Sequence, residues 1–225
     1  MAWRSHGTSN ATLIQHLTAN ALITTPRVAS AMSSIDRAHF SPSAPYRDSP
    51  QSLGHGATIS APHMHANAAE SLLPYLSPGA RVLDIGSGSG YLTCVLAALV
   101  QPGGSVVGVE HIEALREMGE RNAGKGELGS QWVGDGTVRF VRGDGRLGWA
   151  EGAPYDAIHV GAAAGGIAGV EGLVGQLKRP GRLFVPVEGD DGMQHIYVID
   201  KDEDGNVTKK KEYGVQYVPL TDAPA

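Results

Sequence analysis

The segment most informative about the fold is Val82-Leu-Asp-Ile-Gly-Ser-Gly-Ser-Gly-Tyr91. Its apolar start predicts a strand over Arg81–Ile85, and the apolar run that follows it predicts a helix over Gly90–Val100. A glycine-rich turn between a strand and a helix lies beyond the carboxyl end of the strand, where open α/β sheets bind their ligands. Glycines in such a turn let a ligand approach the backbone closely. The stretch therefore predicts a ligand-binding α/β sheet.

Strand and helix patterns alternate through the rest of the central part of the chain. Because strands that alternate with helices are joined by right-handed crossovers, this order predicts a mostly parallel sheet. Two further strand-like segments, 194–200 and 207–218, flank an acidic turn and predict an antiparallel hairpin at one edge of the sheet. Residues 124–136 are expected to form a glycine-rich loop. The other strands are expected at 105–110, 138–142, 155–160 and 181–187, with helices near 111–122 and 168–177.

The residues before about position 78 follow a helical pattern instead. Cap signals at Thr8-Ser9-Asn10, Thr25-Pro26 and Ser60-Ala61-Pro62 predict three helix starts, and Pro74 is expected to end or kink the third helix. Residues 41–62 are rich in Pro, Ser and Gly and predict a long loop. The expected fold class is α/β: a doubly wound, mostly parallel seven-stranded sheet with an antiparallel edge hairpin and an N-terminal helical extension.

The composition favours one globular domain. The chain has 225 residues, and its longest apolar run, Tyr91–Val100, is too short for a membrane span, which takes about 20 residues. The segment after Met1 lacks the apolar stretch of a secretory signal. The single cysteine, Cys94, cannot form an internal disulfide and favours a reducing compartment. A net charge of −5 disfavours nucleic acid as a partner. We therefore expect a cytoplasmic protein with no membrane or nucleic-acid partner.

The spacing of the glycines selects among nucleotide ligands. Gly86, Gly88 and Gly90 alternate with serines, whereas a dinucleotide-binding turn requires a small residue where this chain has Tyr91. The segment 119–126 imitates a phosphate-binding loop, but it lacks the terminal Ser or Thr and follows a helix instead of a strand. An adenosine ligand without a pyrophosphate fits the pattern better.

Acidic residues stand at the ends of three successive strands. Glu110 can accept hydrogen bonds from both hydroxyls of a ribose, because a carboxylate offers acceptors only. Asp144, in a turn between two glycines, can accept from an adenine amino group. Asp84, at the foot of the glycine turn, can orient backbone amides or meet a ligand ammonium. One such residue would indicate a turn or a cap, but three at successive strand ends favour a ligand.

These features resemble the class I S-adenosylmethionine-dependent methyltransferases. Within that class, nearly the whole chain resembles the protein-L-isoaspartate (D-aspartate) O-methyltransferase family. The most specific segment is Thr58-Ile-Ser-Ala-Pro-His-Met-His65. The other segments that carry the resemblance are 48–52, 83–90, 143–146, 155–163 and 217–222.

The resemblance implies a Rossmann-like fold and a protein-repair reaction. The family transfers a methyl group from S-adenosyl-L-methionine to the free carboxylate of L-isoaspartyl, and D-aspartyl, residues in damaged proteins, which leaves a methyl ester and S-adenosyl-L-homocysteine. Its members are typically cytosolic monomers. We accordingly expect one methyltransferase domain over 1–225, with an N-terminal helical and substrate-cap region (1–78), a cofactor-binding core (79–187) and a C-terminal hairpin region (188–225).

Ser60 is the expected catalytic residue. By resemblance it matches the family's active-site serine, which would orient the substrate carboxylate; from its position alone it would cap the helix that begins at Pro62, and the two roles are compatible. Since a carboxylic acid with a reference pKa of about 3.9 is ionised at neutral pH, the reaction needs no strong base. The residues expected to bind the cofactor, several of them by resemblance alone, are Ala57, Thr58, Ile59, Ser60, His65, Asp84, Gly86, Ser87, Gly88, Ser89, Gly90, Glu110, His111, Gly143, Asp144 and Thr221.

The remaining reactive side chains are expected to be structural. His63 and His65 do not predict a metal site, because no third ligand has suitable spacing. His159, on a central strand, is expected to be a core histidine with its hydrogen bonds satisfied, and Cys94 a small apolar core residue.

Two alternatives stay open. The chain could methylate another substrate, a small molecule or a nucleic acid, although it lacks the Asn/Asp-Pro-Pro-Tyr-like segment of amino-methylating DNA enzymes. It could also be a non-catalytic module that binds the cofactor and contacts a protein partner, because the binding glycines would look the same. The intact segment around Ser60 favours an active enzyme.

Overall fold

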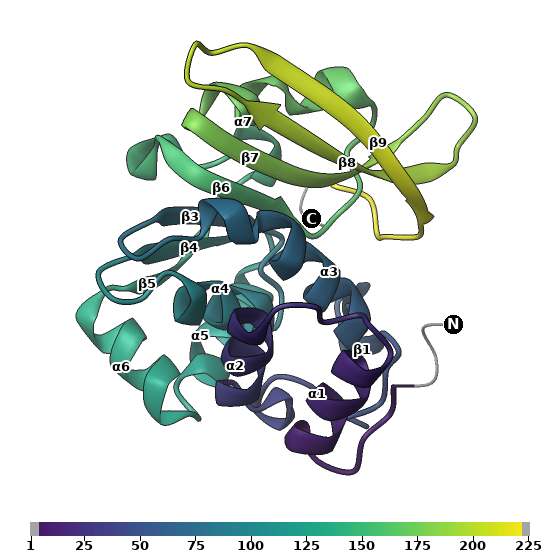
Figure 1. Cartoon of the computed structure of the whole chain (residues 1–225), viewed down its shortest axis with the longest axis vertical. Coiled ribbons are helices and arrows are strands. Elements are labelled where there is room, and N and C mark those ends of the chain that lie inside the picture. Colours follow the sequence, from purple (N-terminus) through teal and green to yellow (C-terminus); the bar gives the residue numbers. More distant parts are fainter. Residues whose placement is uncertain (1–4, 222–225) are drawn as a thin grey trace.

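One sheet of seven strands forms the centre of the molecule (Figure 1). The computed structural model describes residues 5–221, and the strands of this sheet are β3 (Arg81–Ile85), β4 (Ser105–Glu110), β5 (Val138–Arg142), β6 (Tyr155–Val160), β7 (Leu177–Glu188), β8 (Gln194–Lys201) and β9 (Val207–Val215). Their order in space is β5-β4-β3-β6-β7-β8-β9. Neighbours from β5 to β7 pair in parallel, and β8 and β9 add an antiparallel hairpin at one edge. This confirms the predicted fold class.

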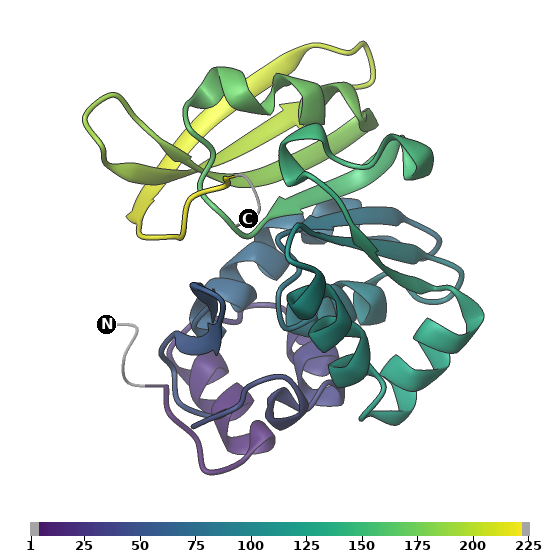
Figure 2. The ribbon, with the colours of Figure 1, turned by 180° about the vertical axis from the view of Figure 1, so that it is seen from behind.

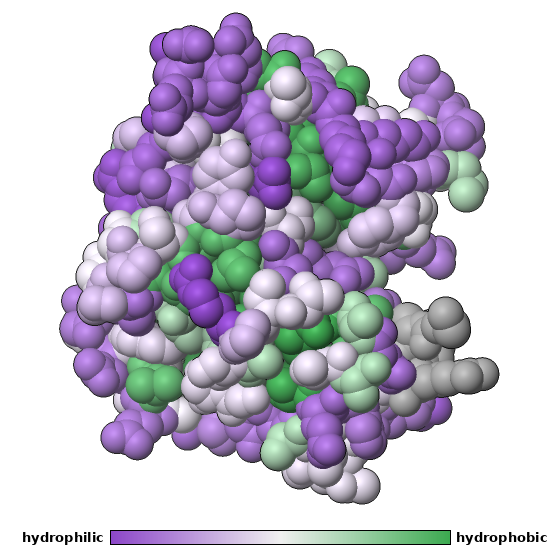
Figure 3. All heavy atoms as spheres, viewed as in Figure 1, coloured by the Kyte–Doolittle hydropathy of each residue, from purple (hydrophilic) through white to green (hydrophobic). Residues whose placement is uncertain are grey.

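Helices cover both faces of the sheet, because its central strands are apolar on both sides. Val82 of β3 packs toward the N-terminal helices, whereas Leu83 and Ile85 pack on the opposite face with Leu173. The helices α4 (Tyr91–Leu99), α5 (Glu113–Ala123) and α6 (Glu127–Asp135) contribute to the first face, and α7 (Glu171–Gly175) to the second. Accordingly α7 lies behind β7 and β8 in Figure 1 and in front of them in Figure 2. On the face that Figure 3 shows, hydrophilic residues predominate and hydrophobic residues appear in smaller patches among them.

The N-terminal extension is helical, as predicted. Ser9 caps α1 (Asn10–Ala19) in a capping box, and α2 (Pro26–Ser34) and α3 (Pro62–Leu72) both begin with proline at the first helical position. A 3-10 turn that contains Pro74 follows α3. Within residues 5–221, no helix has the length and apolar character that crossing a bilayer would require.

The prediction of one long loop over 41–62 is wrong, because this segment contains a β-hairpin. β1 (Gln51–Gly54) and β2 (Ala57–Ile59) pair antiparallel as a separate two-stranded sheet. The turn residues His55 and Gly56 both have positive φ angles, 53° and 71°, which is typical of tight hairpin turns. The hairpin leads the chain directly into the segment that precedes α3.

The predicted glycine-rich loop over 124–136 is also wrong, because α6 occupies most of it. One of its glycines serves close packing: a Cβ on Gly129 would lie 2.4 Å from the carbonyl oxygen of Ala123 in α5. Trp132 is buried beneath the same helix. High glycine content therefore indicated a helix–helix contact here and not a loop.

The helix predicted near 168–177 is shorter than expected. A 3-10 turn (Ile167–Val170) precedes α7, and β7 begins at Leu177, earlier than the predicted strand at 181–187. The early start arises because Leu177 already pairs with Tyr155 of β6. The last strand, in turn, ends at Val215 instead of continuing to residue 218.

A comparison of Gly90, in the glycine turn, with Gly79, outside it, separates the effect of close packing on stability from that of backbone conformation. Both residues have a left-handed φ (84° and 83°), but a Cβ at Gly90 would lie 2.9 Å from Phe140 and 3.0 Å from a backbone oxygen of Gly119, whereas a Cβ at Gly79 meets nothing within 4 Å. Gly79→Ala should lower the free energy of unfolding by about 1–2 kcal/mol through backbone strain. Gly90→Ala should lower it by about 1–3 kcal/mol more through overpacking. Denaturant unfolding measures both values, and equal losses would contradict this account.

Candidate active site

Loops at the carboxyl ends of β3, β4 and β6 enclose a cavity of about 340 Å³, which we call the glycine-loop cavity. This is the edge of the sheet at which the sequence predicts a ligand. The β1–β2 hairpin and the chain after β9 close its remaining sides. The residues that line it include Ala57, Thr58, Gly86, Gly88, Glu110, His111, Gly145, Gly161, Ala162 and Thr221.

The glycine turn is held against β4 by backbone hydrogen bonds. The N–H groups of Gly86 and Ser87 both donate to the carbonyl oxygen of Val109, at 2.8 and 3.1 Å. Gly86 and Gly88 have φ angles of 73° and 49°, a region that residues with a Cβ rarely adopt. The turn is therefore fixed in place and exposes backbone to the cavity.

Glu110 is a buried carboxylate that is fixed before any ligand arrives. Its Oε1 accepts from the backbone N–H groups of His111 and Ile112, at 2.9 and 3.1 Å. Its Oε2 accepts from the N–H of Gly88 at 3.1 Å, which ties the end of β4 to the glycine turn. Because a carboxylate oxygen can accept more than one hydrogen bond, Oε2 retains capacity for a ligand hydroxyl. This is the geometry that the ribose role predicted for Glu110 requires.

Asp84 lies under the glycine turn and is 1% exposed. Its Oδ2 accepts from the hydroxyl of Thr93 at 2.6 Å, and its Oδ1 lies 2.8 Å from Nδ1 of His159. His159 is therefore the partnered core histidine that the sequence predicts, and it also stacks on Phe184. Asp84 lines a small pocket of about 30 Å³ beneath the turn and not the glycine-loop cavity, so its side chain braces β3 against β6 and α4.

Asp144 lies beside the glycine-loop cavity, and its carboxylate is engaged by Arg146. Nε of Arg146 donates to both carboxylate oxygens, at 2.9 and 3.0 Å, and Nη2 donates at 2.6 Å. These hydrogen bonds hold the pKa of Asp144 below its usual value. Gly145 is the residue of this turn that lines the cavity. An adenine amino group would therefore have to share the carboxylate with Arg146.

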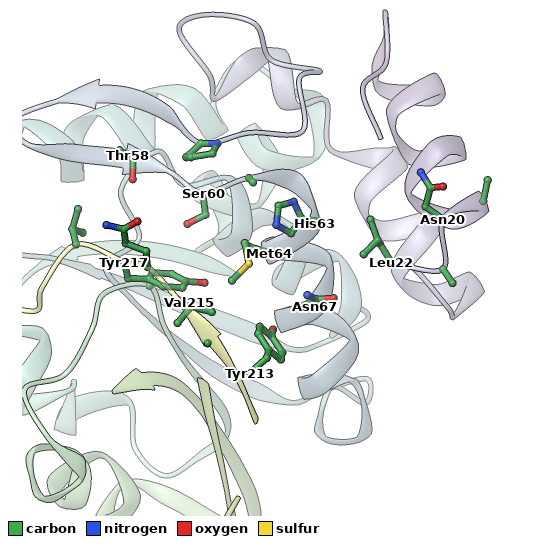
Figure 4. A pocket seen from close by; sticks show the side chains of 18 residues that line it. Asn20, Leu22, Thr58, Ser60, His63, Met64, Asn67, Tyr213, Val215 and Tyr217 are labelled. Atoms are coloured by element: carbon green, nitrogen blue, oxygen red, sulfur yellow. The ribbon is translucent and has the colours of Figure 1, made fainter. Parts of the chain in front are cut away.

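A second cavity of about 900 Å³ adjoins the first, and we call it the α3–β9 cavity (Figure 4). Thr58, Gly161 and Val218 line both cavities, so the two meet there. The end of α1 forms one side of the second cavity. The facing walls carry Ser60, His63, Met64 and Asn67 from the start of α3, and Tyr213, Val215 and Tyr217 from β9 and the chain after it.

Ser60 lies beside the place where the cavities join. It lines the α3–β9 cavity and also the small pocket that holds Gly86 and Gly88. The expectation that Ser60 caps α3 is wrong, because the cap position is Ala61, which makes no side-chain hydrogen bond to the helix. The hydroxyl of Ser60 is therefore not committed to the helix and faces the cavity (Figure 4).

Arg37 is a site residue that the sequence did not reveal. Its side chain is fully buried; Nη2 donates to the carbonyl oxygen of Ser60 at 2.7 Å, and Nη1 lies 3.1 Å from Nδ1 of His65. The guanidinium also lies over the ring of Tyr91, 5.0 Å from its centroid. Burial lowers the pKa of Arg37 to about 10, which leaves it charged at neutral pH.

This contact fixes the protonation of His65. A guanidinium only donates, so Nδ1 of His65 must accept, and the neutral ring carries its proton on Nε2. Burial, followed by the charge of Arg37, lowers the pKa of His65 well below its usual value. His65 therefore presents an N–H donor, not a cation, in the small pocket next to Ser60.

The other reactive groups are not arranged for catalysis. Burial raises the pKa of Cys94 to about 12, so the thiol stays protonated in the core beside the glycine turn. Among residues 5–221, no three His, Cys, Asp or Glu side chains are grouped to hold a metal ion.

Comparison with known proteins places the chain in a family. Residues 8–225 match the family described as protein-L-isoaspartate(D-aspartate) O-methyltransferase. A Caenorhabditis elegans protein named protein-L-isoaspartate O-methyltransferase is 48% identical over 221 residues, which cover 98% of this chain and 96% of the relative. The chain belongs to this family.

Further relatives agree in sequence and in structure. Protein-L-isoaspartate O-methyltransferase 1 of Arabidopsis thaliana is 46% identical over 96% of this chain and 93% of its own. A crystal structure of a candidate protein-L-isoaspartate O-methyltransferase from Plasmodium falciparum, in complex with S-adenosyl-L-homocysteine, superposes with a TM-score of 0.86 at 30% identity, covering 96% of this chain and 99% of that one.

The structure gathers most of the residues that the family resemblance nominated. Those that line neither the glycine-loop cavity nor the small pocket beneath the turn are Gly90, Gly143 and Asp144. The residues on the glycine-loop cavity are Ala57, Thr58, Gly86, Gly88, Glu110, His111 and Thr221, and those on the small pocket are Ile59, Ser60, His65, Asp84, Ser87 and Ser89.

The protonation of His65 can be read from stability. Below about pH 6.5, the reference pKa of histidine, the unfolded chain binds a proton at His65 and the folded protein does not. The free energy of unfolding therefore falls as the pH falls below this value, by up to about 1.4 kcal/mol per pH unit. His65→Asn keeps an acceptor for Arg37 but cannot titrate, so its unfolding free energy should fall less between pH 7 and 5 than that of the wild type. Urea unfolding at both pH values measures the difference. The exposed Gln15→Asn, which removes no titratable group, should keep the wild-type slope, and an equal slope in His65→Asn would contradict this assignment.

Proposed function

We propose that the protein transfers the methyl group of S-adenosyl-L-methionine to the free carboxylate of L-isoaspartyl, and D-aspartyl, residues in damaged proteins, as a repair reaction. The observation that carries this proposal is the position of Ser60. It lines the α3–β9 cavity and the small pocket beneath the glycine turn, and Thr58 and Gly161 connect both of these with the glycine-loop cavity. A transferase must bring its two substrates into contact at one point, and two cavities that adjoin each other permit this contact. The family to which the chain belongs supports the choice of reaction.

The residues of the glycine-loop cavity fit the adenosyl part of the cofactor. Glu110 has its carboxylate fixed and lines the cavity, so it would accept the ribose hydroxyls. The turn at Gly86 and Gly88 presents backbone without side chains, which permits close approach. The Plasmodium falciparum structure, which superposes on this chain, holds S-adenosyl-L-homocysteine and supports the same choice. When bound, the cofactor supplies an electrophilic methyl group on a sulfonium.

The chain's own residues bind and orient the carboxylate. The hydroxyl of Ser60 would donate one hydrogen bond to it, which positions the nucleophile without quenching it as a full ion pair would. Arg37 holds the backbone of Ser60 through its carbonyl. Because opposite charges are lost together in the transition state, exclusion of water from the site by the bound substrate should favour the reaction. Orientation alone can supply about 7–11 kcal/mol.

A labelling assay tests the proposed function. The protein is incubated with methyl-labelled S-adenosyl-L-methionine and two matched peptides, one L-isoaspartyl and one aspartyl. We expect label on the isoaspartyl peptide alone, released as methanol in mild base, as a carboxyl methyl ester requires. Label on RNA or on a small molecule would indicate another methyltransferase. Cofactor binding without any transfer would indicate a non-catalytic module.

Ser60→Ala should slow turnover and leave cofactor binding unchanged. Loss of a hydrogen bond to a charged group predicts a fall in kcat of roughly 10- to 100-fold. Steady-state kinetics and calorimetry with S-adenosyl-L-homocysteine measure the two effects. Ser77→Ala, an exposed serine before β3, is the matched control. Wild-type kcat in Ser60→Ala would remove Ser60 from the mechanism.

In contrast to Ser60→Ala, Glu110→Gln should weaken cofactor binding and leave turnover unchanged. The amide group can no longer accept at both ends, so it faces the N–H groups of His111, Ile112 and Gly88 with one donor too many. We expect the Kd for S-adenosyl-L-homocysteine to rise about tenfold or more, with kcat at saturating cofactor close to that of the wild type. Glu113→Gln on the exposed side of α5 controls for the lost charge. Unchanged affinity would exclude the ribose role.

We also propose that the protein acts as a cytoplasmic monomer and as one methyltransferase domain over 1–225, without nucleic-acid or membrane partners. Its net charge of −5 supports this, because it disfavours phosphate backbones and anionic membranes. Light scattering of the purified protein should give the mass of one chain, and the mass of a dimer would overturn the monomer proposal.

A further inference from the structure

The α3–β9 cavity is lined by a histidine, His63, that is held by a buried carboxylate. His63 lies three residues after Ser60, in the first turn of α3, on the same wall of the cavity (Figure 4), and its side chain is 14% exposed. Asp48 is fully buried behind it. Oδ1 of Asp48 accepts from the backbone N–H of His63 at 3.1 Å and lies 2.7 Å from Nδ1 of the same residue. The other oxygen, Oδ2, is buried without a hydrogen-bond partner.

These contacts determine which nitrogen of His63 faces the cavity. An ionised carboxylate only accepts hydrogen bonds, so Nδ1 of His63 carries a proton and donates it to Asp48. The remaining nitrogen, Nε2, is on the opposite side of the ring from Asp48 and is left for the cavity that the ring lines. In the neutral ring this nitrogen is a hydrogen-bond acceptor. Asp48 thus holds His63 in the tautomer that offers an acceptor.

The chemistry of the cavity restricts how it can recognise an isoaspartyl residue. No Lys, Arg, Asp or Glu is among the described residues that line it, so an ion pair with the substrate is not available on these walls. In an L-isoaspartyl residue the free carboxylate is attached to the α-carbon, which also carries an amide N–H. In an aspartyl residue the carboxylate is attached to a methylene carbon, which carries none. An acceptor next to the bound carboxylate would therefore distinguish the two.

We propose that Nε2 of His63 accepts this amide N–H while Ser60 holds the neighbouring carboxylate, and that His63 is a residue that determines specificity for the isoaspartyl linkage. Asp48 acts through His63 as a positioning residue. The inference rests on the proposed function. It also separates the two substrates of that function, because the carboxylate of a D-aspartyl residue has no N–H on the adjacent carbon.

A pair of peptides tests the proposal through the atom concerned. One peptide contains L-isoaspartate, and the other contains the matching ester, in which oxygen replaces the amide N–H on the α-carbon. The wild type should show a kcat/KM roughly three- to tenfold higher on the amide, as expected for one hydrogen bond. His63→Phe, which keeps a ring but has no acceptor, should lose this preference. Equal kcat/KM for the two peptides in the wild type would overturn the proposal without any variant.

Further variants exclude a merely structural effect. His63→Gln and Asp48→Asn retain acceptors and should keep much of the amide-over-ester preference, whereas Asp48→Leu should lose it. Met64→Leu, on the same wall, should keep the wild-type ratio.

His63→Phe should also leave the kcat/KM for a D-aspartyl peptide and the affinity for S-adenosyl-L-homocysteine within about twofold of the wild type. An unchanged amide-over-ester ratio in His63→Phe would overturn this inference alone; absence of transfer to the amide peptide by the wild type would overturn the proposed function with it.

Discussion

The buried guanidinium of Arg37 is the interaction on which the geometry of the site depends. It donates to the carbonyl of Ser60, pairs with Nδ1 of His65 and lies over the ring of Tyr91. These partners belong to the segment before α3, to α3 itself and to the first residue of α4, so one side chain ties the N-terminal extension to the helix after the glycine turn. Burial disfavours the charge of Arg37, and these neutral partners, together with the nearby charge of Asp48, offset that cost.

Elements with a strong local pattern were predictable from the sequence, and those that arise from packing were not. The strands at 81–85 and 105–110 have the predicted bounds, because strands buried on both faces read as short apolar runs. The helix α6 was not predicted because Gly129 permits its close contact with α5, and glycine content alone does not distinguish such a contact from a loop. The β1–β2 hairpin was missed for a related reason: its turn is His55-Gly56, and its strands are too short to show an alternating pattern.

The residues of the site differ in the same way in how far the sequence predicts them. Glu110 could be inferred from its place after a strand, because the ends of neighbouring parallel strands meet at one edge. Arg37 and Asp48 carry no local signal, since their importance lies in contacts with Ser60, His65 and His63, which are distant in sequence. Tyr91 illustrates the difference: in the sequence it only disfavours a dinucleotide, whereas in the structure its ring packs against Arg37, Phe40 and His65 and joins the extension to the core.

The α3–β9 cavity shows why neutral groups suit this reaction better than cations. A lysine or arginine beside the substrate would bind the carboxylate tightly, but that attraction weakens as the carboxylate loses its charge in the transition state, so it would stabilise the ground state more and lower kcat. In the proposed mechanism, a hydroxyl from Ser60 and an imidazole nitrogen from His63 would instead fix the position of the substrate and leave the charge of the nucleophile largely intact. The walls that hold them come from the ends of α1 and β9 and from α3, segments far apart in the chain, so the site exists only when the whole fold is assembled. The complete fold would thus position the substrate carboxylate with neutral groups instead of charged side chains. This placement is the physical basis on which this chain can act on one abnormal linkage among many ordinary carboxylates.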